Sequence, residues 1–316
     1  MKKKEELEKE LIKKKKDEFR KILNDVFEEM KTCSRVFSNE AQLQYELAVR
    51  LKDKKYEDLI HGVELEVLSS NLKVEDFNKM SDSEIEKNKF YTDIVVNLGE
   101  EEYVAIELKF KTPEYGKNVK IKKHIVKNTD NEFYTFSQGA ETEGGFLFWS
   151  DVARLEKFGK SKEENGILLN FNDSKKVIQK FAILMTNAKR YWTRESSRDS
   201  LCENFFPVEY SDDNTKTQKV FSGNLCWKIK VCIKNGEEYR VSGRTSTKRK
   251  DCEVNIKELA YDEHDKFKNY YVIKSGEEKI RELRPIHLEG EYKCDWKDYL
   301  ELEDETKFRY LILEVK

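Results

Sequence analysis

The chain has 316 residues, of which 39% are charged and 38% are hydrophobic. This length is enough for one large domain or two ordinary ones, and the chain contains no apolar run long enough to span a membrane. Lys and Arg (60) nearly balance Asp and Glu (62), so the net charge of −2 gives no evidence for a nucleic-acid partner. Any attraction to phosphate must come from local clusters.

The N-terminus and the cysteines indicate the compartment. The first residues lack the apolar segment of a signal peptide. The six cysteines form no Cys-x-x-Cys pair, and the four histidines lie far apart in the sequence. We therefore expect a cytoplasmic protein with free thiols and without a structural zinc site.

Two helices are expected at the start of the chain. Residues 1–34 contain neither Gly nor Pro and place apolar residues near helical spacing, interrupted by the basic run Lys13–Lys16. We expect a solvated extension whose second half packs on the body; a dimerising helix and a basic arm that touches nucleic acid are the alternatives. A second helix is expected to begin at Ser38–Asn39, one of which is the N-cap. Glu40 and Glu46 near its start are candidate inward-facing carboxylates, with a surface position as the alternative for each.

Apolar periodicity predicts the elements up to about residue 190. Alternation with period two indicates strands, and a continuous apolar run of strand length indicates a strand buried on both faces. The expected elements are, in chain order, a strand over 63–68, a polar loop over 69–88, a β-hairpin with strands 91–98 and 103–110, a helical segment over 133–158 that is continuous or divided at Gly144-Gly145, and a central strand over 181–187.

Short β-like runs separated by turn residues dominate the chain beyond residue 200. They either extend the first sheet or form a second, smaller lobe. The runs cover 225–233, 238–242, 270–273, 289–293 and 308–315. We therefore expect three regions, which are an N-terminal helical extension (1–34), an α/β core (35–200) and a β-rich C-terminal region (201–316) packed on that core.

Three charged residues interrupt the apolar strands of the expected hairpin, namely Asp93, Glu107 and Lys109. Glu107 and Lys109 point to the same face because side chains alternate along a strand, and a hairpin of this size brings Asp93 opposite Glu107. Such charges are costly unless they are paired, hydrated or bound to a metal. Two carboxylates and a backbone carbonyl, that of Leu108, are oxygen ligands suited to Mg²⁺, and Lys109 is then placed to orient a water. A buried Glu–Lys pair or charged decoration of a sheet edge is the alternative.

Other reaction chemistries find little support in the sequence. Gly159-Lys160-Ser161 resembles the end of a phosphate-binding loop, but Arg154 stands where that loop requires a glycine. The chain has no Gly-x-Ser-x-Gly nucleophile elbow and no dinucleotide-binding glycine motif.

The order of a helix with Glu40, a strand, a strand with Asp93, a strand with Glu107-Leu108-Lys109, a helix and a strand resembles the PD-(D/E)XK nuclease superfamily. This resemblance implies a restriction-endonuclease-like mixed sheet flanked by helices. It also implies that Asp93 and Glu107 hold one or two Mg²⁺ ions, for which Mn²⁺ substitutes, that Glu40 completes the metal shell, and that Lys109 assists the attacking water. Tyr91-Thr92-Asp93 lacks the proline of the superfamily's name, which removes one support for the register but no metal ligand.

Further motifs resemble a group of largely uncharacterised bacterial members of this superfamily. The resemblance implies that Gln138 lies near the active centre, and it covers about residues 36–316. The matching motifs are Gln138-Gly139-Ala140, Asp151-Val152-Ala153-Arg154-Leu155-Glu156, Met185-Thr186-Asn187, Tyr191-Trp192, Gly223–Trp227, Leu288–Tyr299 and Phe308-Arg309-Tyr310-Leu311.

The resemblance implies a Mg²⁺-dependent endonuclease that hydrolyses phosphodiester bonds in DNA, in a restriction or phage-defence role. Tyr191 and Trp192 are candidate base-stacking side chains, although a core position is the alternative for Trp192. A catalytically silent nucleic-acid- or protein-binding module of the same fold and an RNA-cleaving nuclease are the alternative functions. A homodimer is left open. Candidate positive surfaces, for which simple solvation is the alternative, are Lys117–Lys127, Arg190–Arg198 and Thr247–Lys250.

Overall fold

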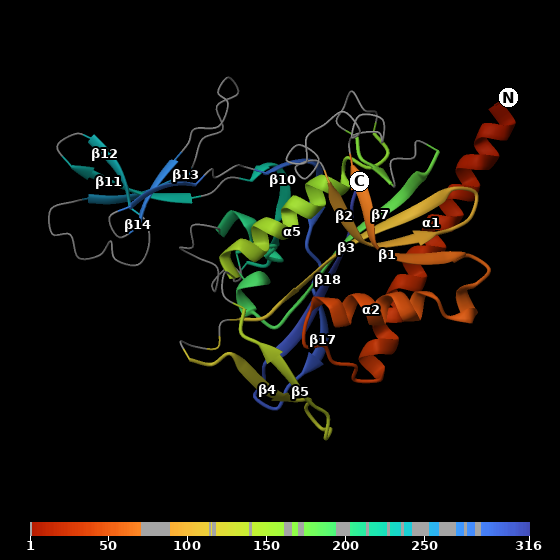
Figure 1. The fold of residues 1–316 in the computed structure, drawn as a ribbon, viewed down its shortest axis with the longest axis horizontal. Coiled ribbons are helices and arrows are strands. Elements are labelled where there is room, and N and C mark those ends of the chain that lie inside the picture. The colour runs from red at the N-terminus through yellow and green to blue at the C-terminus, as the bar shows by residue number, and fades with distance from the viewer. Residues whose placement is uncertain are drawn as a thin grey trace. The chain divides into compact units, whose positions relative to one another are not determined.

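The structure is a computed structural model, shown as a ribbon in Figure 1. It describes residues 2–70, 89–113, 115, 118–138, 141–160, 166–169, 174–193, 203–212, 215–225, 228–234, 237–241, 253–258, 270–274, 277–281 and 286–316. The chain divides into two compact units. Unit 1 comprises Met1–Glu141, Asp151–Ala188 and Asp295–Lys316, and unit 2 comprises Thr142–Ser150 and Lys189–Cys294. The expected region 201–316 is therefore shared between the two units.

A seven-stranded mixed sheet forms the centre of unit 1, in the order β17-β18-β7-β3-β2-β1-β6. β3 and β7 run parallel, and the other neighbours are antiparallel. With its helices this sheet gives a mixed α/β (α+β) protein, as the sequence predicts. The strands are β1 (Gly62–Ser70), β2 (Phe90–Asn97), β3 (Glu102–Lys111), β6 (Leu168–Leu169), β7 (Lys176–Thr186), β17 (Lys297–Glu301) and β18 (Lys307–Glu314).

The β2–β3 hairpin forms where the sequence predicts it. Ile94 pairs with Ile106, so Asp93 falls opposite Glu107 when this register is continued by one residue. The connecting turn uses a left-handed backbone at Gly99, where φ is 80°. Glycine adopts this conformation without steric cost, which explains why the turn begins there.

Two helices, α1 (Lys2–Thr32) and α2 (Glu40–Leu51), pack on one face of the sheet (Figure 1). Phe27 of α1 stacks on Tyr310 of β18 with ring centroids 4.7 Å apart. Arg20 pairs with Glu314 at 2.7 Å. The second half of α1 therefore belongs to the core, as expected, whereas the side chain of Leu7 is exposed. The core residues of α1 are Phe19, Ile22, Leu23, Val26, Phe27 and Met30.

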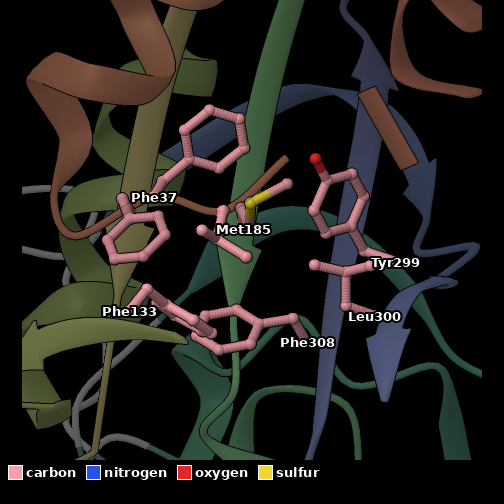
Figure 2. A pocket seen from close by; sticks show the side chains of 8 residues that line it. Phe37, Phe133, Met185, Tyr299, Leu300 and Phe308 are labelled. Atoms are coloured by element: carbon pink, nitrogen blue, oxygen red, sulfur yellow. The ribbon is translucent and has the colours of Figure 1, made fainter. Parts of the chain in front are cut away.

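A cavity of about 10 Å³ remains in this core. Figure 2 shows that Phe37, Phe133, Met185 and Phe308 surround it, together with residues of β17. A cavity of this size holds about one water molecule at most, and a water needs polar partners. The cavity is therefore a small packing gap rather than a ligand site.

The prediction of a helix over 133–158 is wrong in its first part. Residues Glu132–Phe136 form the strand β5, which pairs with β4 (Ile121–Ile125). Phe133 and Thr135 are buried while their neighbours are exposed, which is the period of a strand. The helix α5 begins at Glu141 and continues without a break to Leu155. Gln138 therefore precedes this helix instead of lying on it.

Unit 2 consists of the first part of α5 and small β-structures. Trp149 of α5 stacks on Phe221 of β10 at 4.6 Å. A Cβ atom on Gly145 would lie 2.5 Å from the carbonyl oxygen of Phe205, so the close approach of these two segments requires glycine. The described strands are β8 (Tyr210–Asp212), β9 (Thr217–Gln218), β10 (Val220–Leu225), β11 (Lys228–Lys234), β12 (Glu237–Val241), β13 (Glu253–Glu258), β14 (Tyr270–Lys274), β15 (Glu277–Arg281) and β16 (Ile286–Lys293).

Some strands of the C-terminal half extend the large sheet of unit 1, and others form separate β-structures in unit 2. The run that ends the chain forms β18 and joins the large sheet of unit 1. The strands of unit 2 form one three-stranded sheet, β12-β11-β13, and two-stranded pairs. Most of the expected loop 69–88 lies outside the described residues. Within the part of the chain that the structure covers, no helix has the length and apolar character needed to cross a membrane.

Candidate active site

Asp93 and Glu107 lie on neighbouring strands of the central hairpin. The Oδ2 atom of Asp93 accepts a hydrogen bond of 2.6 Å from the backbone N–H of Leu108. Glu107 is 2% exposed, and its Oε2 atom lies 2.7 Å from Nη2 of Arg154. Both carboxylates are therefore held close to the same stretch of β3, as the hairpin register requires.

The last turns of α5 supply the counter-ions of this site. Nη2 of Arg154 bridges two carboxylates, because it also lies 2.9 Å from Oδ1 of Asp151. The other oxygen of Asp151, Oδ2, lies 2.9 Å from Nζ of Lys109. Glu107 and Lys109 thus face the same helix, which agrees with the expected common face. We call Asp93, Glu107, Lys109, Asp151 and Arg154 the charged cluster.

Glu40 reaches the edge of the charged cluster from the first turn of α2. Asn39 begins this helix as its N-cap, because its Oδ1 atom accepts a hydrogen bond of 2.9 Å from the N–H of Gln42. The Oε2 atom of Glu40 accepts from the N–H of Phe110 at 2.8 Å, and its Oε1 atom lies 3.9 Å from Nζ of Lys109. Glu40 is therefore held beside Lys109.

Gln44, one helical turn after Glu40, contacts the strand that carries Asp93. Its Nε2 atom donates to the carbonyl oxygen of Asp93 at 2.8 Å and to Oε1 of Glu66 at 2.7 Å. Glu66 lies on β1 with a left-handed φ of 51°, between residues that pair with β2. The amide of Gln44 therefore holds the backbone of Asp93 in place.

Burial raises the pKa values of both predicted metal-binding carboxyls. The pKa of Asp93 rises to about 6, because its burial outweighs the hydrogen bond from Leu108 and the charge of Lys109. Burial also raises the pKa of Glu107 well above its usual value, and the attraction of Arg154 does not compensate. In both carboxyls the cost of burying the charge outweighs the favourable contacts of the ionised form.

Lys109 behaves differently from the two acids. Burial acts to lower the pKa of Lys109, but Asp151, Glu40 and Asp93 together outweigh burial and keep this pKa above its ordinary value. Lys109 is therefore an ammonium at neutral pH. It can donate hydrogen bonds and stabilise negative charge, but it cannot take a proton from water.

A divalent cation fits the donor chemistry of Asp93 and Glu107. Among the described residues, the Oε1 atom of Glu107 is buried and has no hydrogen-bond partner. Such an acceptor is costly unless a donor or a cation satisfies it. The carbonyl oxygen of Leu108 accepts a hydrogen bond of 3.0 Å from Lys109 and retains a second lone pair.

The three expected metal carboxylates do not form a ready-made shell. In the described ranges no group of three or more His, Cys, Asp or Glu residues is arranged to hold a metal ion. One reason is that Glu40 is engaged by Phe110, and another is that Arg154 holds one oxygen of Glu107. Any metal must therefore compete with these contacts.

Two further candidates, Gln138 and Glu46, form no hydrogen bond or ion pair with Asp93, Glu107 or Lys109 among the described residues. Gln138 follows β5, and its Oε1 atom is buried without a hydrogen-bond partner in the described part of the chain. Glu46 pairs instead with Arg35 and Arg50, each at 3.0 Å, and so does not point to the site.

The sequence contained a signal for the residues that were missed. Asp151 and Arg154 belong to one motif of the expected helix, and their i, i+3 spacing puts them on one face of it. Gln44 likewise follows Glu40 by four residues and shares its face of α2. What the sequence did not reveal is which strand each face meets.

The predicted nucleic-acid contacts are only partly described. Within Lys117–Lys127, Lys122 pairs with Asp304 at 2.8 Å and Lys127 with Glu301 at 2.7 Å, so these charges are compensated. Tyr191 is fully buried and packs on Phe206, which rules out base stacking by its ring. Trp192 is half-buried. The segments 194–200 and 242–250, with most of the other predicted basic residues, lie outside the described residues.

Comparison of the chain with protein-family models, with curated proteins and with solved structures found no match.

Proposed function

We propose that the protein is a divalent-metal-dependent nuclease of the PD-(D/E)XK type, which hydrolyses phosphodiester bonds in DNA and serves restriction or phage defence. One observation supports this most strongly. Glu107, whose buried Oε1 atom has no hydrogen-bond partner within the described residues, lies on the strand next to Asp93, with the ammonium of Lys109 on the same face.

In this proposal the residues divide the work as follows. Asp93, Glu107 and the carbonyl of Leu108 would hold Mg²⁺ or Mn²⁺, and Glu40 would contribute from α2. Such an ion lowers the pKa of a bound water and neutralises charge on the phosphate. Lys109 donates a hydrogen bond to the attacking water and stabilises the negative charge that develops on the phosphoryl oxygens. Because Lys109 is protonated, it positions that water and does not serve as the base.

A cleavage assay tests the proposal. The purified protein is incubated with single- and double-stranded DNA and RNA in the presence of Mg²⁺, Mn²⁺ or EDTA. We expect metal-dependent cleavage of DNA, its loss in Asp93→Asn, and a decrease of about a hundredfold to a thousandfold in Lys109→Met. Asp298→Asn is the matched control, because Asp298 pairs with Lys307 and Arg309 outside the charged cluster. Cleavage that is unchanged in Asp93→Asn contradicts the site.

One observation favours a second candidate, a catalytically silent binding module. Arg154 and Lys109 already pair with the acidic side chains of the cluster. A protein that cuts none of the four substrates, yet binds nucleic acid with an affinity that falls as salt rises, supports this candidate. If the protein cleaves RNA but not DNA, RNA is the substrate and the proposed site residues stay the same.

A further inference from the structure

The guanidinium of Arg154 occupies the position of a cation between buried carboxylates. A single nitrogen, Nη2, lies 2.7 Å from Oε2 of Glu107 and 2.9 Å from Oδ1 of Asp151. These two carboxylates are 2% and 8% exposed, so solvent hardly screens them. Arginine is charged at every relevant pH and binds carboxylates well, which makes it an effective counter-ion here.

Among the described residues, few other contacts hold Arg154 in this position. Its Nε atom is buried and has no hydrogen-bond partner among the described residues. The ring of Phe90 lies beneath the guanidinium, 5.9 Å from its central carbon atom. Attraction to Glu107 and Asp151 therefore determines where the guanidinium lies.

The charge of the cluster leaves room for a further cation. Asp93, Glu107 and Asp151 provide three acidic groups, whereas Lys109 and Arg154 provide two positive charges. Glu40, 3.9 Å from Lys109, adds a fourth acidic group at the edge. A divalent ion that binds Glu107 meets Arg154 on the same carboxylate, and two cations at one carboxylate repel each other.

We infer that Arg154 is a resident counter-ion that competes with the divalent metal for the carboxylate of Glu107, so that metal binding displaces the guanidinium from it. This inference rests on the proposed metal site and adds its regulation. In the metal-free protein, the contact between Arg154 and Glu107 then keeps the site folded. The same contact sets the metal concentration at which the site becomes occupied.

Calorimetric titration with Mn²⁺ tests the competition without any measurement of cleavage. In Arg154→Gln the competing charge is absent, and we expect Mn²⁺ to bind at least about tenfold more tightly than in the wild type. Without metal, Arg154→Gln melts at a lower temperature than the wild type because Glu107 loses its partner. Addition of Mn²⁺ raises the melting temperature of Arg154→Gln by more than it raises that of the wild type. Arg154→Lys retains a charge, and its affinity lies between the two.

Arg20→Gln is the matched control. Arg20 also pairs with a glutamate, Glu314, at 2.7 Å, but neither residue belongs to the charged cluster. We expect Arg20→Gln to leave the Mn²⁺ affinity unchanged. The inference is overturned if the wild type binds Mn²⁺ and Arg154→Gln binds it equally tightly or more weakly. Absence of binding in both overturns the inference and the proposed metal site together.

A measurement on the wild type keeps the inference testable should Arg154→Gln fail to fold. The Nε–H signal of Arg154 in a nitrogen-correlated NMR spectrum is assigned by its absence in Arg154→Lys. Titration with Mg²⁺, which is diamagnetic, shifts this signal when the guanidinium leaves Glu107. A signal that stays in place while Mg²⁺ shifts the amide signals of β2 and β3 contradicts the displacement.

Discussion

Replacing Asp93 by asparagine is expected to stabilise the metal-free protein. Burial raises the pKa of Asp93 from 3.8 to about 6, so ionised Asp93 is less favourable in the folded chain than in the unfolded chain. A group of this kind contributes stability that is fully present below pH 3.8 and is lost as the pH rises through about 6. Asparagine has nearly the same shape and carries no charge at any of these pH values.

The size of the effect follows from the two pKa values. Moving the pKa from 3.8 to about 6 corresponds to about 3 kcal/mol when the carboxylate is fully ionised. Asp93 is half-buried, and the amide of asparagine accepts more weakly from Leu108 than a carboxylate does. We therefore expect a gain of about 1–2 kcal/mol in the free energy of unfolding at pH 7.5.

Urea denaturation in EDTA at pH 7.5 and pH 4.5 measures this gain, which is largest at pH 7.5 and shrinks towards pH 4. Asp298→Asn is a control of opposite sign: burial acts to raise the pKa of Asp298, but Lys307 and Arg309 outweigh it and lower that pKa. Its ionised form stabilises the fold, so Asp298→Asn lowers the stability. An Asp93→Asn variant that is less stable than the wild type at pH 7.5 refutes the reasoning.

Two substitutions test the α1 and α2 packing. Phe27→Ala removes a fully buried ring that stacks on Tyr310, and we expect a loss of about 3–5 kcal/mol in the free energy of unfolding measured with urea. Leu7→Ala, in the exposed part of α1, is the control and changes the stability by less than about 0.5 kcal/mol. A loss below about 1 kcal/mol in Phe27→Ala means that α1 is not part of the core. Asn39→Ala removes the N-cap acceptor of α2 and costs about 1 kcal/mol, while Asn39→Asp retains the acceptor and the stability; equal losses in both variants count against the cap.

The local parts of the fold follow from the sequence. The hairpin was predictable because alternating apolar residues flank a turn with glycine at its first position, and these signals depend on neighbours in the chain alone. The start of α2 was predictable for a similar reason, since Asn39 offers a side-chain acceptor to the first turn. The same hairpin register brought Asp93 opposite Glu107, so the central pair of the site could be inferred without a structure.

The parts that could not be predicted depend on contacts between distant segments. Glu132–Phe136 has a pattern that suits a helix or a strand, and its pairing with β4 decides in favour of the strand. Nothing local in Lys307–Glu314 shows that this strand pairs with β7. The partners of Glu107 and Lys109 were missed for the same reason, because α5 is separated from β3 by 29 residues of chain in which the sequence shows no sign of where the helix will dock.

The charged cluster differs from an ion-pair network whose only role is to join two elements. Such a network stabilises the fold least when its charges are unbalanced, because each buried charge without a partner costs free energy. Here three acidic groups share two cations, and the Oε1 atom of Glu107 lacks a hydrogen bond within the described residues. Well-packed apolar residues would join α5 to β3 at lower cost. Folding alone thus gives no reason for the excess of carboxylates, whereas a cation-binding site does, and the expected stabilisation by Asp93→Asn measures the size of that excess.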